Sequence, residues 1–355
     1  MAGNGGSAAR RRLVPYCTGN PLKVIHTCFL LEHNAKSDQV DQSSMRYFPD
    51  PDRNLDLGDV NRVVEAAFAD HGKGLVQMPP KVYITLPAGD FRTMPGFLPS
   101  LGIAGVKIVN VHPDNPKVGL PTVMALTIIL DTATGRPTAI LNATRLTDMR
   151  TGAAGAIAAK YLAPKRECVL GVIGTGRQAE AQVHATAQEL SLLSVRVWSR
   201  NPAHAEGFAA RLAPLTAESV SIEKACDSDI LVTTTPSRSP VVRSEWIHPG
   251  THINAIGADA PGKEELDPEI LHRARVFVDD PAQAFHSGEI NVPIRKGLYQ
   301  PWMISGTLGE VVIGKRKRES KDEITVFDST GLAIQDLAIA SIALRQASGM
   351  ELPFL

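Results

Sequence analysis

The feature that most constrains this chain is a glycine-rich turn, Gly174-Thr-Gly176-Arg-Gln-Ala179, between a strand pattern and a helix pattern. The apolar run Cys168 to Ile173 precedes it, and the helical pattern that follows has an apolar face of Ala179, Val183, Ala187 and Leu190. In such a unit Gly174 permits a tight turn, Gly176 lets the backbone approach a pyrophosphate, and Ala179 allows close helix packing. A purely structural turn is the alternative, but the flanking strand and helix favour dinucleotide binding at the helix N-terminus.

Apolar runs beyond this turn continue the pattern of an α/β domain with parallel strands. They are Val195 to Trp198, Asp229 to Val232 and Ile253 to Ile256. A last strand, Ile324 to Phe327, leads to a nearly all-apolar helical stretch, Leu332 to Leu344, which must be buried. We therefore predict a Rossmann dinucleotide-binding domain over residues 164–322.

The N-terminal half has a different pattern. Residues 1–20 are rich in Gly, Ser and Arg without periodicity, which indicates a mobile tail. A helix is expected to begin at a cap on Asp56 or Asp59 and to end at Gly72. Strand-like runs punctuated by prolines follow and predict a β-rich domain; the runs are Val82 to Ile84, Ala104 to Val109 and Val123 to Leu130, and the prolines are Pro79, Pro80, Pro95, Pro113 and Pro121.

Length and composition narrow the class of protein. The 355 residues suffice for about two domains, and 37 Lys and Arg balance 37 Asp and Glu, so nucleic acid and anionic membranes are not expected partners. No apolar run reaches the length of a membrane span, so we expect a cytoplasmic protein. The cysteines and histidines show no metal-ligand spacing, so no metal is expected; the residues considered were Cys17, Cys28, Cys168, Cys226, His112, His252 and His286.

The end of the second Rossmann strand bears on the choice of dinucleotide. NAD enzymes place an acidic residue there for the ribose hydroxyls, whereas this chain has Ser199, Arg200 and Asn201. A guanidinium can grip a 2′-phosphate through two charge-assisted hydrogen bonds. The alternative is that Arg200 is a solvated surface arginine. We predict that NADP(H) is preferred and that NAD(H) is possible.

Several segments together resemble the ornithine cyclodeaminase/mu-crystallin family, and within it the archaeal-type alanine dehydrogenases. The resemblance covers the chain from about Leu57 to the C-terminus. Besides the glycine-rich turn, the segments that carry it are Met78-Pro-Pro-Lys-Val-Tyr83, Gly89-Asp-Phe-Arg92, Gly105-Val-Lys-Ile-Val-Asn110 with the following Val-His-Pro113, Arg150-Thr-Gly-Ala-Ala154, Thr233-Thr-Thr-Pro-Ser-Arg238, Gly257-Ala-Asp-Ala-Pro-Gly-Lys263 and Phe327-Asp-Ser-Thr-Gly331.

The resemblance implies a substrate site. Lys81, Lys107 and Arg150 fall where the family binds its substrate carboxylate, and Asp259 falls where cyclodeaminases carry an acid/base carboxylate. A carboxylate substrate requires fixed cations, and a lysine among other cations has a lowered pKa. Lys107 has apolar neighbours along the chain, so we predict it as the acid/base, with Asp259 as a second catalytic residue. Without the family, Lys81 could equally be a surface residue and Arg150 a structural arginine.

One position departs from the cyclodeaminases, which place a glutamate there for the side-chain amine of ornithine. This chain has Arg92, which would repel an ammonium group and suits a second hold on a carboxylate or keto oxygen. Oxidative deamination of a small amino acid therefore fits better than cyclisation of a diamine. The resemblance also implies cofactor contacts, which are Thr122, Arg150, Gly174, Gly176, Arg177, Gln178, Ala179, Ser199, Arg200, Asn201, Thr233, Thr235, Ala258, Lys263 and Ser329.

The predicted fold is α/β, with the Rossmann domain inserted beside a discontinuous β-rich catalytic and dimerisation domain of residues 21–163 and 323–355. The predicted activity is reversible NAD(P)-dependent deamination of a small L-amino acid, in particular L-alanine to pyruvate and ammonia, by a homodimer. Ornithine or lysine cyclodeaminase and ketimine reductase are the alternative enzymes. A crystallin-like protein that binds the cofactor without turnover is the alternative outside enzymes.

Overall fold

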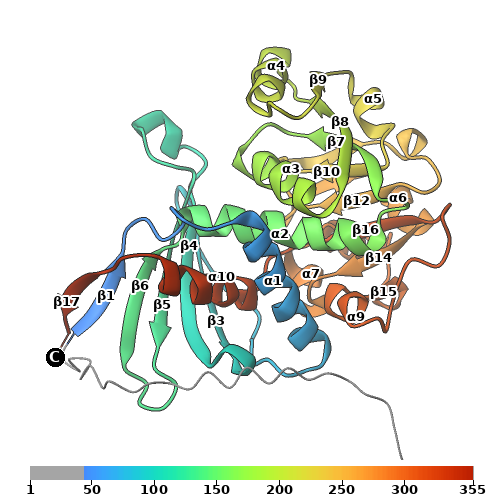
Figure 1. The fold of residues 1–355 in the computed structure, drawn as a ribbon. Helices are drawn as coiled ribbons and strands as arrows, with labels where there is room; N and C mark the ends of the chain where they lie inside the picture. The colour runs from blue at the N-terminus through green and yellow to red at the C-terminus, as the bar shows by residue number, and fades with distance from the viewer. Residues whose placement is uncertain (1–43, 355) are drawn as a thin grey trace, which may run out of the picture. The chain divides into compact units, whose positions relative to one another are not determined.

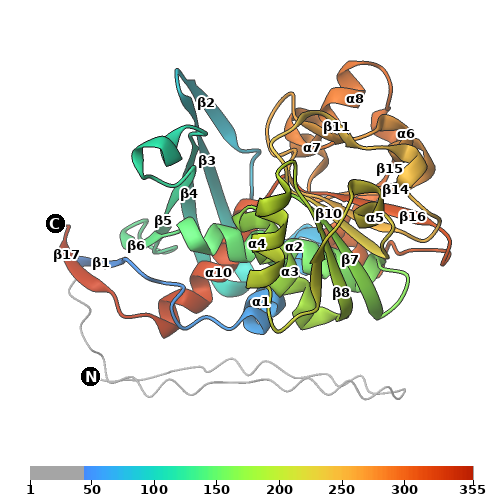
Figure 2. The ribbon, with the colours of Figure 1, turned by 90° about the horizontal axis from the view of Figure 1, so that it is seen from above.

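The computed structural model describes residues 44–354, and the prediction of a tail over residues 1–20 lies outside them. The described chain contains two large sheets and a two-stranded one, with helices against both large sheets (Figures 1 and 2). The predicted α/β fold with a Rossmann unit beside a β-rich part is confirmed. No helix in residues 44–354 is long and apolar enough to cross a membrane.

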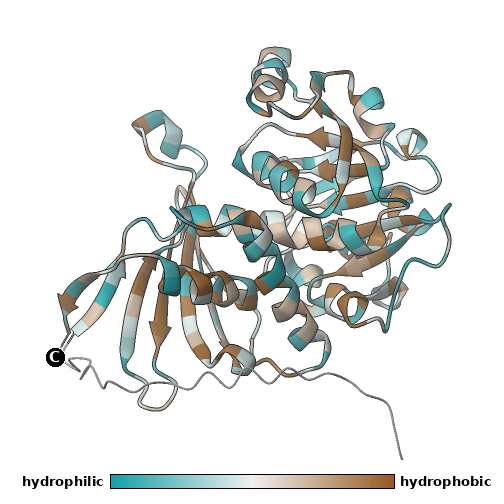
Figure 3. Ribbon diagram, viewed as in Figure 1, coloured by the Kyte–Doolittle hydropathy of each residue, from teal (hydrophilic) through white to brown (hydrophobic). Residues whose placement is uncertain are grey.

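The eight-stranded sheet is wholly parallel and has the order β15-β14-β16-β12-β10-β7-β8-β9. From β7 the chain adds β8 and β9 on one side, then returns to add β10 on the other, so the topological switch point lies between β7 and β10. Its strands are largely hydrophobic (Figure 3). They are β7 (Glu167–Ile173), β8 (Ser191–Trp198), β9 (Ala217–Ser219), β10 (Ile230–Thr233), β12 (His252–Ala255), β14 (Ala274–Val278), β15 (Ile304–Thr307) and β16 (Ile324–Asp328).

Helices and a small parallel sheet connect these strands. Because parallel strands need crossover connections, the helices lie on the faces of the sheet, and the central strands β10, β12 and β16 are buried on both sides. The helices are α3 (Arg177–Glu189), α4 (Pro202–Arg211), α5 (Ile222–Cys226), α6 (Pro268–Arg273), α7 (Pro281–Ser287), α8 (Asn291–Arg295) and α9 (Leu308–Val312), and the small sheet pairs β11 (Arg238–Val242) with β13 (Glu264–Leu266).

The seven-stranded sheet is mainly antiparallel, in the order β17-β1-β6-β5-β4-β3-β2. One face packs on helix α10 (Ala333–Gln346), which contacts β3 and β4. An added Cβ on Gly96 of β3 would lie 3.3 Å from Leu337 of α10, so the contact is close. The strands are β1 (Ser44–Phe48), β2 (Val82–Leu86), β3 (Gly89–Leu98), β4 (Ile103–Val111), β5 (Val123–Leu130), β6 (Pro137–Asn142) and β17 (Met350–Pro353).

Two further helices contact both regions. Helix α1 (Leu57–Gly72) packs on α2, α9 and α10, and helix α2 (Thr144–Leu162) contacts both β5 and β12. The predicted start of α1 is confirmed, because Asp56 caps it by accepting a hydrogen bond from the Asp59 amide at 3.1 Å. The end at Gly72 is confirmed as well.

Three features differ from the sequence-based expectations. Pro95 lies inside β3 rather than between strands. The Phe97 amide bonds Gln77 on the side away from β4, so by alternation the Pro95 nitrogen also faces the edge where β2 has ended and no ladder bond is lost. A strand that was not predicted, β1, precedes Asp56 and pairs with β17 from the other end of the described chain. The third difference is β16, which we expected in the β-rich segment 323–355 but which is a central strand of the parallel sheet. We propose a boundary after Asp328.

Candidate active site

The glycine-rich turn connects β7 to α3, as the sequence predicts, and it lies at the topological switch point of the parallel sheet. Gly174 follows β7 with φ +110°, a backbone conformation that residues with a side chain rarely adopt. An added Cβ would also lie 2.7 Å from Thr234 Oγ1. Gly176 is the N-cap of α3 and has no side-chain cap. An added Cβ on Gly176 would meet no atom within 4 Å, so the described chain leaves open space beside the unpaired first amides of α3. These features fit a bound pyrophosphate.

The first two residues of α3 reach toward helix α2. The Gln178 side chain donates to Asp148 Oδ1 at 2.8 Å, and Arg177 pairs with the other oxygen of the same carboxylate. Burial raises the pKa of Asp148, against the effect of Arg177. Asp148 thus orients both predicted cofactor contacts, a partnership that the sequence analysis did not anticipate.

The end of β8 carries the residues predicted to select the dinucleotide. Arg200 is exposed and has no hydrogen-bond or ion-pair partner among residues 44–354. Asn201 has a structural role, because its side chain caps α4 by accepting from the Ala203 amide at 3.1 Å. Arg200, beside Ser199, is therefore available to an anion at this edge.

A cluster of buried cations lies between α2, α10 and the seven-stranded sheet. Lys107 on β4 donates to Asp336 Oδ1 at 2.7 Å, and Arg150 on α2 donates to the same oxygen at 3.0 Å. Lys81, just before β2, donates to the backbone carbonyl of Thr330. All three cations are buried. The structure thus brings together the three residues predicted to hold the substrate carboxylate.

Burial and mutual repulsion change the acidity of both lysines. Burial, followed by Arg150, lowers the pKa of Lys107 to about 7, against the opposing effect of Asp336. Burial and Arg92 lower the pKa of Lys81 to about 8. Near neutral pH each amine is therefore present in both its neutral and its protonated form, whereas a lysine in water is almost fully protonated there.

The backbone makes room for the third cation. Gly331 has φ +83°, and an added Cβ there would lie 2.7 Å from Arg150 Nη1, so a side chain at this position would displace the guanidinium. Gln335 accepts from Arg150 Nη1 at 2.8 Å. The guanidinium is thus fixed from two sides.

Arg92 and Asp259 form a second ionic group. Arg92 Nε lies 2.7 Å from Asp90, and Arg92 Nη1 lies 2.9 Å from Asp259 Oδ2. Lys263 pairs with the other oxygen of Asp259, and Tyr83 donates to the Asp259 carbonyl at 3.2 Å. Burial alone would raise the pKa of Asp259, but Arg92 and Lys263 outweigh it and hold that pKa well below its usual range. The guanidinium of Arg92 therefore donates to two carboxylates of the chain, Asp90 and Asp259, whereas the sequence analysis expected the Arg92 donors to face a substrate.

Buried carboxylates support the loops under the cation cluster. Asp279, at the end of β14, accepts from the amides of Thr330 and Gly331 at 2.7 and 2.6 Å. Asp328, at the end of β16, accepts from the Glu289 amide at 2.8 Å. Burial raises the pKa of Asp328 to about 7. These acids fix the turn that carries the Lys81 acceptor.

Glu265 organises the neighbouring strand ends. Its carboxylate accepts from Thr233 Oγ1 at 2.7 Å, from Thr235 Oγ1 at 2.7 Å and from the Gly257 amide at 2.8 Å. Thr233 and Thr235 were predicted as cofactor contacts, and both hydroxyls are engaged by Glu265. Burial, followed by the charge of Glu265, raises the pKa of Glu289 well above its usual range.

The remaining predicted cofactor residues divide into two groups. Ala258 and Ser329 are buried just beyond the carboxyl ends of β12 and β16, and the Ser329 amide donates to the Ala255 carbonyl at 3.0 Å. Thr122 lies at the start of β5, where its carbonyl accepts from the His112 amide at 2.8 Å. No hydrogen bond in the described part of the chain joins Thr122 to the glycine-rich turn.

Sequence reasoning missed several acids of the site. Asp90, Asp148, Glu265, Asp279 and Asp336 were not singled out, although each contacts a predicted site residue or its loop. One signal was available for Asp336, because a carboxylate in an otherwise apolar helix must find a buried cation.

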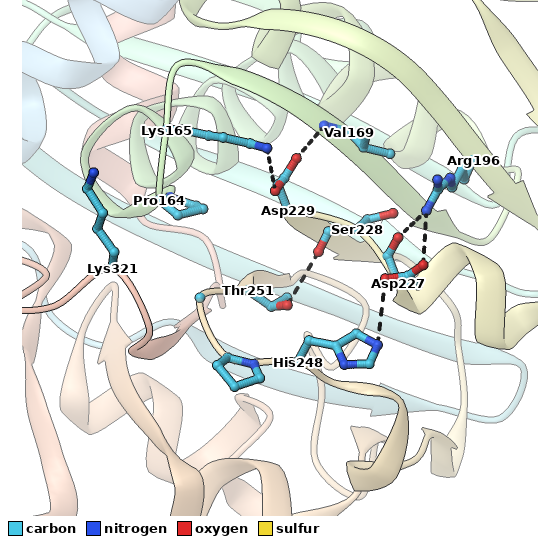
Figure 4. A pocket seen from close by; sticks show the side chains of 12 residues that line it. Pro164, Lys165, Val169, Arg196, Asp227, Ser228, Asp229, His248, Thr251 and Lys321 are labelled. Atoms are coloured by element: carbon cyan, nitrogen blue, oxygen red, sulfur yellow. Dashed lines mark hydrogen bonds and ion pairs between the residues drawn. The ribbon is translucent and has the colours of Figure 1, made fainter.

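A separate cavity of about 400 Å³ lies at the amino ends of the parallel strands, opposite the ends that carry the candidate site (Figure 4). Among its lining residues are Val169, Asp229 and Thr251, near the starts of β7, β10 and β12. Asp229 accepts from the Val169 amide and pairs with Lys165, so its charge is compensated. Because open α/β sheets bind ligands at the carboxyl ends of their strands, this cavity lies away from the candidate site. Residues 44–354 contain no group of His, Cys, Asp and Glu arranged for a metal ion.

The chain is similar to known proteins in both sequence and structure. An alanine dehydrogenase of Archaeoglobus fulgidus is 49% identical over 296 residues, 82% of this chain and 91% of that protein. The solved structure of an archaeal alanine dehydrogenase dimer with bound NAD has a TM-score of 0.85 at 45% identity and covers 88% of this chain and 100% of its own. Thermococcus litoralis Δ1-pyrroline-2-carboxylate reductase, solved with NADH and L-proline, has a TM-score of 0.83 at 34% identity and covers 86% and 99%. The model of the ornithine cyclodeaminase/mu-crystallin family matches residues 45–350, so the predicted resemblance is confirmed and the chain belongs to this family.

Proposed function

We propose that the protein is an NAD(P)-dependent amino acid dehydrogenase that converts L-alanine reversibly to pyruvate and ammonia. The observation that carries the proposal is the buried cluster of Lys81, Lys107 and Arg150, three cations with one directly bonded carboxylate, Asp336. Such a cluster has excess positive charge for the carboxylate of an amino or keto acid. The similarity to the Archaeoglobus alanine dehydrogenase supports the same substrate class.

The ionic group at Arg92 favours a short substrate. A diamine such as ornithine needs a free carboxylate for its second ammonium group, but Asp90 and Asp259 are both paired with Arg92, and Asp259 also with Lys263. A second ammonium group would therefore meet compensated acids and two cations. This arrangement disfavours cyclodeamination.

Nicotinamide in its oxidised form would accept a hydride from the α-carbon of the amino acid. The turn at Gly174 and Gly176, the start of α3 and the loops after β10 and β12 would hold the dinucleotide. Ser199 and Arg200 support a preference for NADP(H), because a hydroxyl and a guanidinium follow β8 where NAD enzymes place a carboxylate. The solved relatives contain NAD or NADH, which makes this preference a point for direct measurement.

Lys107 is the proposed acid/base. Its pKa of about 7 lets it take up and return a proton during imine hydration and ammonia release. Arg150 and Lys81 would hold the substrate carboxylate. Asp259, with its pKa held low, acts as a fixed anion that orients Arg92 and Lys263.

A homodimer through the seven-stranded sheet is part of the proposal. On the face away from α10, Ile108 of β4 pairs directly with Leu126 of β5, and their side chains are 38% and 44% exposed. The same face carries exposed Val82, Ile84 and Leu86 on β2. Exposed apolar side chains that gather on one face of a sheet are typical of an interaction surface, and the archaeal relative is a dimer. A cytoplasmic location remains a prediction.

Initial-rate assays test the activity. Pyruvate with ammonium should oxidise NADPH or NADH, and L-alanine should reduce the oxidised cofactor. Ammonia release from ornithine or lysine without net redox change would instead identify a cyclodeaminase, and reduction of cyclic imines without ammonium a ketimine reductase. Saturable NADPH fluorescence with no turnover of any of these compounds would indicate a crystallin-like binding protein.

A further inference from the structure

Helix α10 carries a buried acid where its sequence is otherwise apolar. In its first two turns, Gln335 and Asp336 are the polar side chains among Ala, Ile and Leu, and all of these residues are buried. The helix lies against β3 and β4 (Figure 1). An ionised side chain in such a place costs several kcal/mol unless it is paired, so its partners define its role.

The partners of Asp336 are the central residues of the candidate site. One oxygen, Oδ1, accepts from Lys107 Nζ at 2.7 Å and from Arg150 Nε at 3.0 Å. A single acceptor atom therefore fixes the relative positions of the proposed acid/base and a proposed carboxylate-binding residue. The three residues come from β4, α2 and α10, which are distant in sequence.

We propose that Asp336 is a positioning residue that fixes the side chains of Lys107 and Arg150 relative to each other and keeps Lys107 able to carry a proton. The proposal deepens the proposed function, because it assigns the group on which the proton-transfer role of Lys107 depends. Asp336 itself need not touch the substrate.

The charges around Lys107 support this assignment. Arg150 faces it from α2, Lys81 from the segment before β2, and Asp336 from α10. Both cations and burial favour the neutral amine, whereas Asp336 favours the ammonium form. More remote charges, Arg92, Asp259 and Asp279, face Lys81. Asp336 is the only carboxylate hydrogen-bonded to Lys107 within residues 44–354.

Nuclear magnetic resonance of protein labelled at the lysine side chains measures the titration of Lys107 without requiring activity. The signal is assigned by its absence in Lys107→Met. In Asp336→Asn the titration midpoint should fall by at least about one pH unit, because burial and two cations are then unopposed. The matched control is Gln335→Met, on the same helix, which removes an acceptor from Arg150 but none from Lys107 and should leave the midpoint unchanged.

A second variant tests the same relationship with the opposite sign, in case Asp336→Asn does not fold. Arg150→Gln removes a cation that lowers the pKa of Lys107, so the midpoint should rise. An unmoved Lys107 midpoint in Asp336→Asn or in Arg150→Gln, or an equal shift in Gln335→Met, would overturn the proposal.

The activity arm separates this inference from the proposed function. In an active enzyme, the limb of the pH profile that follows Lys107 should move with the resonance in Asp336→Asn. If the variants show the expected Lys107 shifts but the wild-type protein does not turn over pyruvate or alanine, the proposed function is refuted and the role of Asp336 stands.

Discussion

The guanidinium of Arg92 lies 2.9 Å from the carboxylate of Asp259 and so joins strand β3 to the loop that follows β12. The two residues are 167 positions apart in sequence, and each had been assigned its own role from the sequence. Because they are paired, the charge state of Asp259 and the free donors of Arg92 depend on each other. Arg92 keeps Asp259 ionised, and Asp259 takes a donor that Arg92 would otherwise offer to a substrate.

Replacement of Arg92 should therefore change the titration of Asp259. In Arg92→Gln, the largest effect that lowers the pKa of Asp259 is lost while burial still raises it, so Asp259 becomes protonated at a higher pH than in the wild type. We expect a higher KM for pyruvate and a loss of kcat/KM that grows as the pH falls. Asp90→Asn is the matched control, since it removes the other partner of Arg92 and keeps the pair with Asp259. A variant with the wild-type KM and pH profile would contradict this role.

The preference for NADP(H) is tested at Ser199. In Ser199→Asp a carboxylate would repel the 2′-phosphate and accept hydrogen bonds from the free ribose hydroxyls, so kcat/KM should shift toward NAD(H). Ser191→Asp, at the other end of β8, controls for the added charge. If kcat/KM of the wild type is already higher with NAD(H) by tenfold or more, about 1.4 kcal/mol, then Arg200 does not bind the 2′-phosphate.

Removal of the Lys107 amine should affect the chemical step. Lys107→Met keeps the length and apolar stem of the side chain, so the cofactor should still bind, while kcat falls by ~10²–10⁴. The wild-type profile should show a group that titrates near the pKa of about 7 given by burial and Arg150. Lys81→Met should mainly raise KM, as expected for a residue that holds the carboxylate. Near-normal turnover in Lys107→Met would exclude Lys107 as the acid/base.

The sequence was sufficient where structure depends on neighbours along the chain. The turn at Gly174 and the capped start of α1 at Asp56 were predictable, because glycine conformation and capping are local. The sheet strand formed by residues 44–48 was not, because its pairing with β17 joins opposite ends of the described chain.

The candidate site shows the same division. The cations Lys81, Lys107 and Arg150 were identified through a family resemblance, but their acid Asp336 lies 229 positions after Lys107. Sequence spacing carries no information about such a contact. The pairing of Arg92 with Asp259 could not be predicted for the same reason, since Asp259 follows β12 of the other large sheet.

The proposed dimer is tested on the open face of the seven-stranded sheet. Ile108→Lys places a charge beside Leu126 on this face, so sedimentation should show a shift from dimer to monomer. Leu193→Lys is the control, because Leu193 is 54% exposed on β8 of the other large sheet. A wild-type protein that sediments as a monomer would refute the interface, as would an Ile108→Lys variant that remains a dimer.

Stability should depend on pH through His252, which is fully buried in the parallel sheet. Its ring nitrogens lie 2.9 Å from Thr325 Oγ1 and 3.0 Å from Asn254 Oδ1, and burial, followed by Arg318, lowers its pKa to about 3. An unfolded histidine titrates near pH 6.5, so between these values the unfolded chain binds a proton that the folded chain excludes. The contribution of His252 to stability is therefore complete above about pH 6.5 and declines by ~1.4 kcal/mol for each pH unit below it.

Comparison with His252→Gln isolates this contribution, because other groups act in the same range. Asp328 has the opposite sign: its pKa is raised to about 7 in the folded state, so it favours folding most at low pH. Denaturant unfolding between pH 4 and 6.5 should give a free energy that rises more steeply with pH in the wild type than in His252→Gln, by about one proton's slope. Exposed His204→Gln controls for the loss of an imidazole elsewhere and should keep the wild-type slope. Equal slopes in the wild type and His252→Gln would mean that His252 takes up its proton in the folded protein as readily as in the unfolded chain.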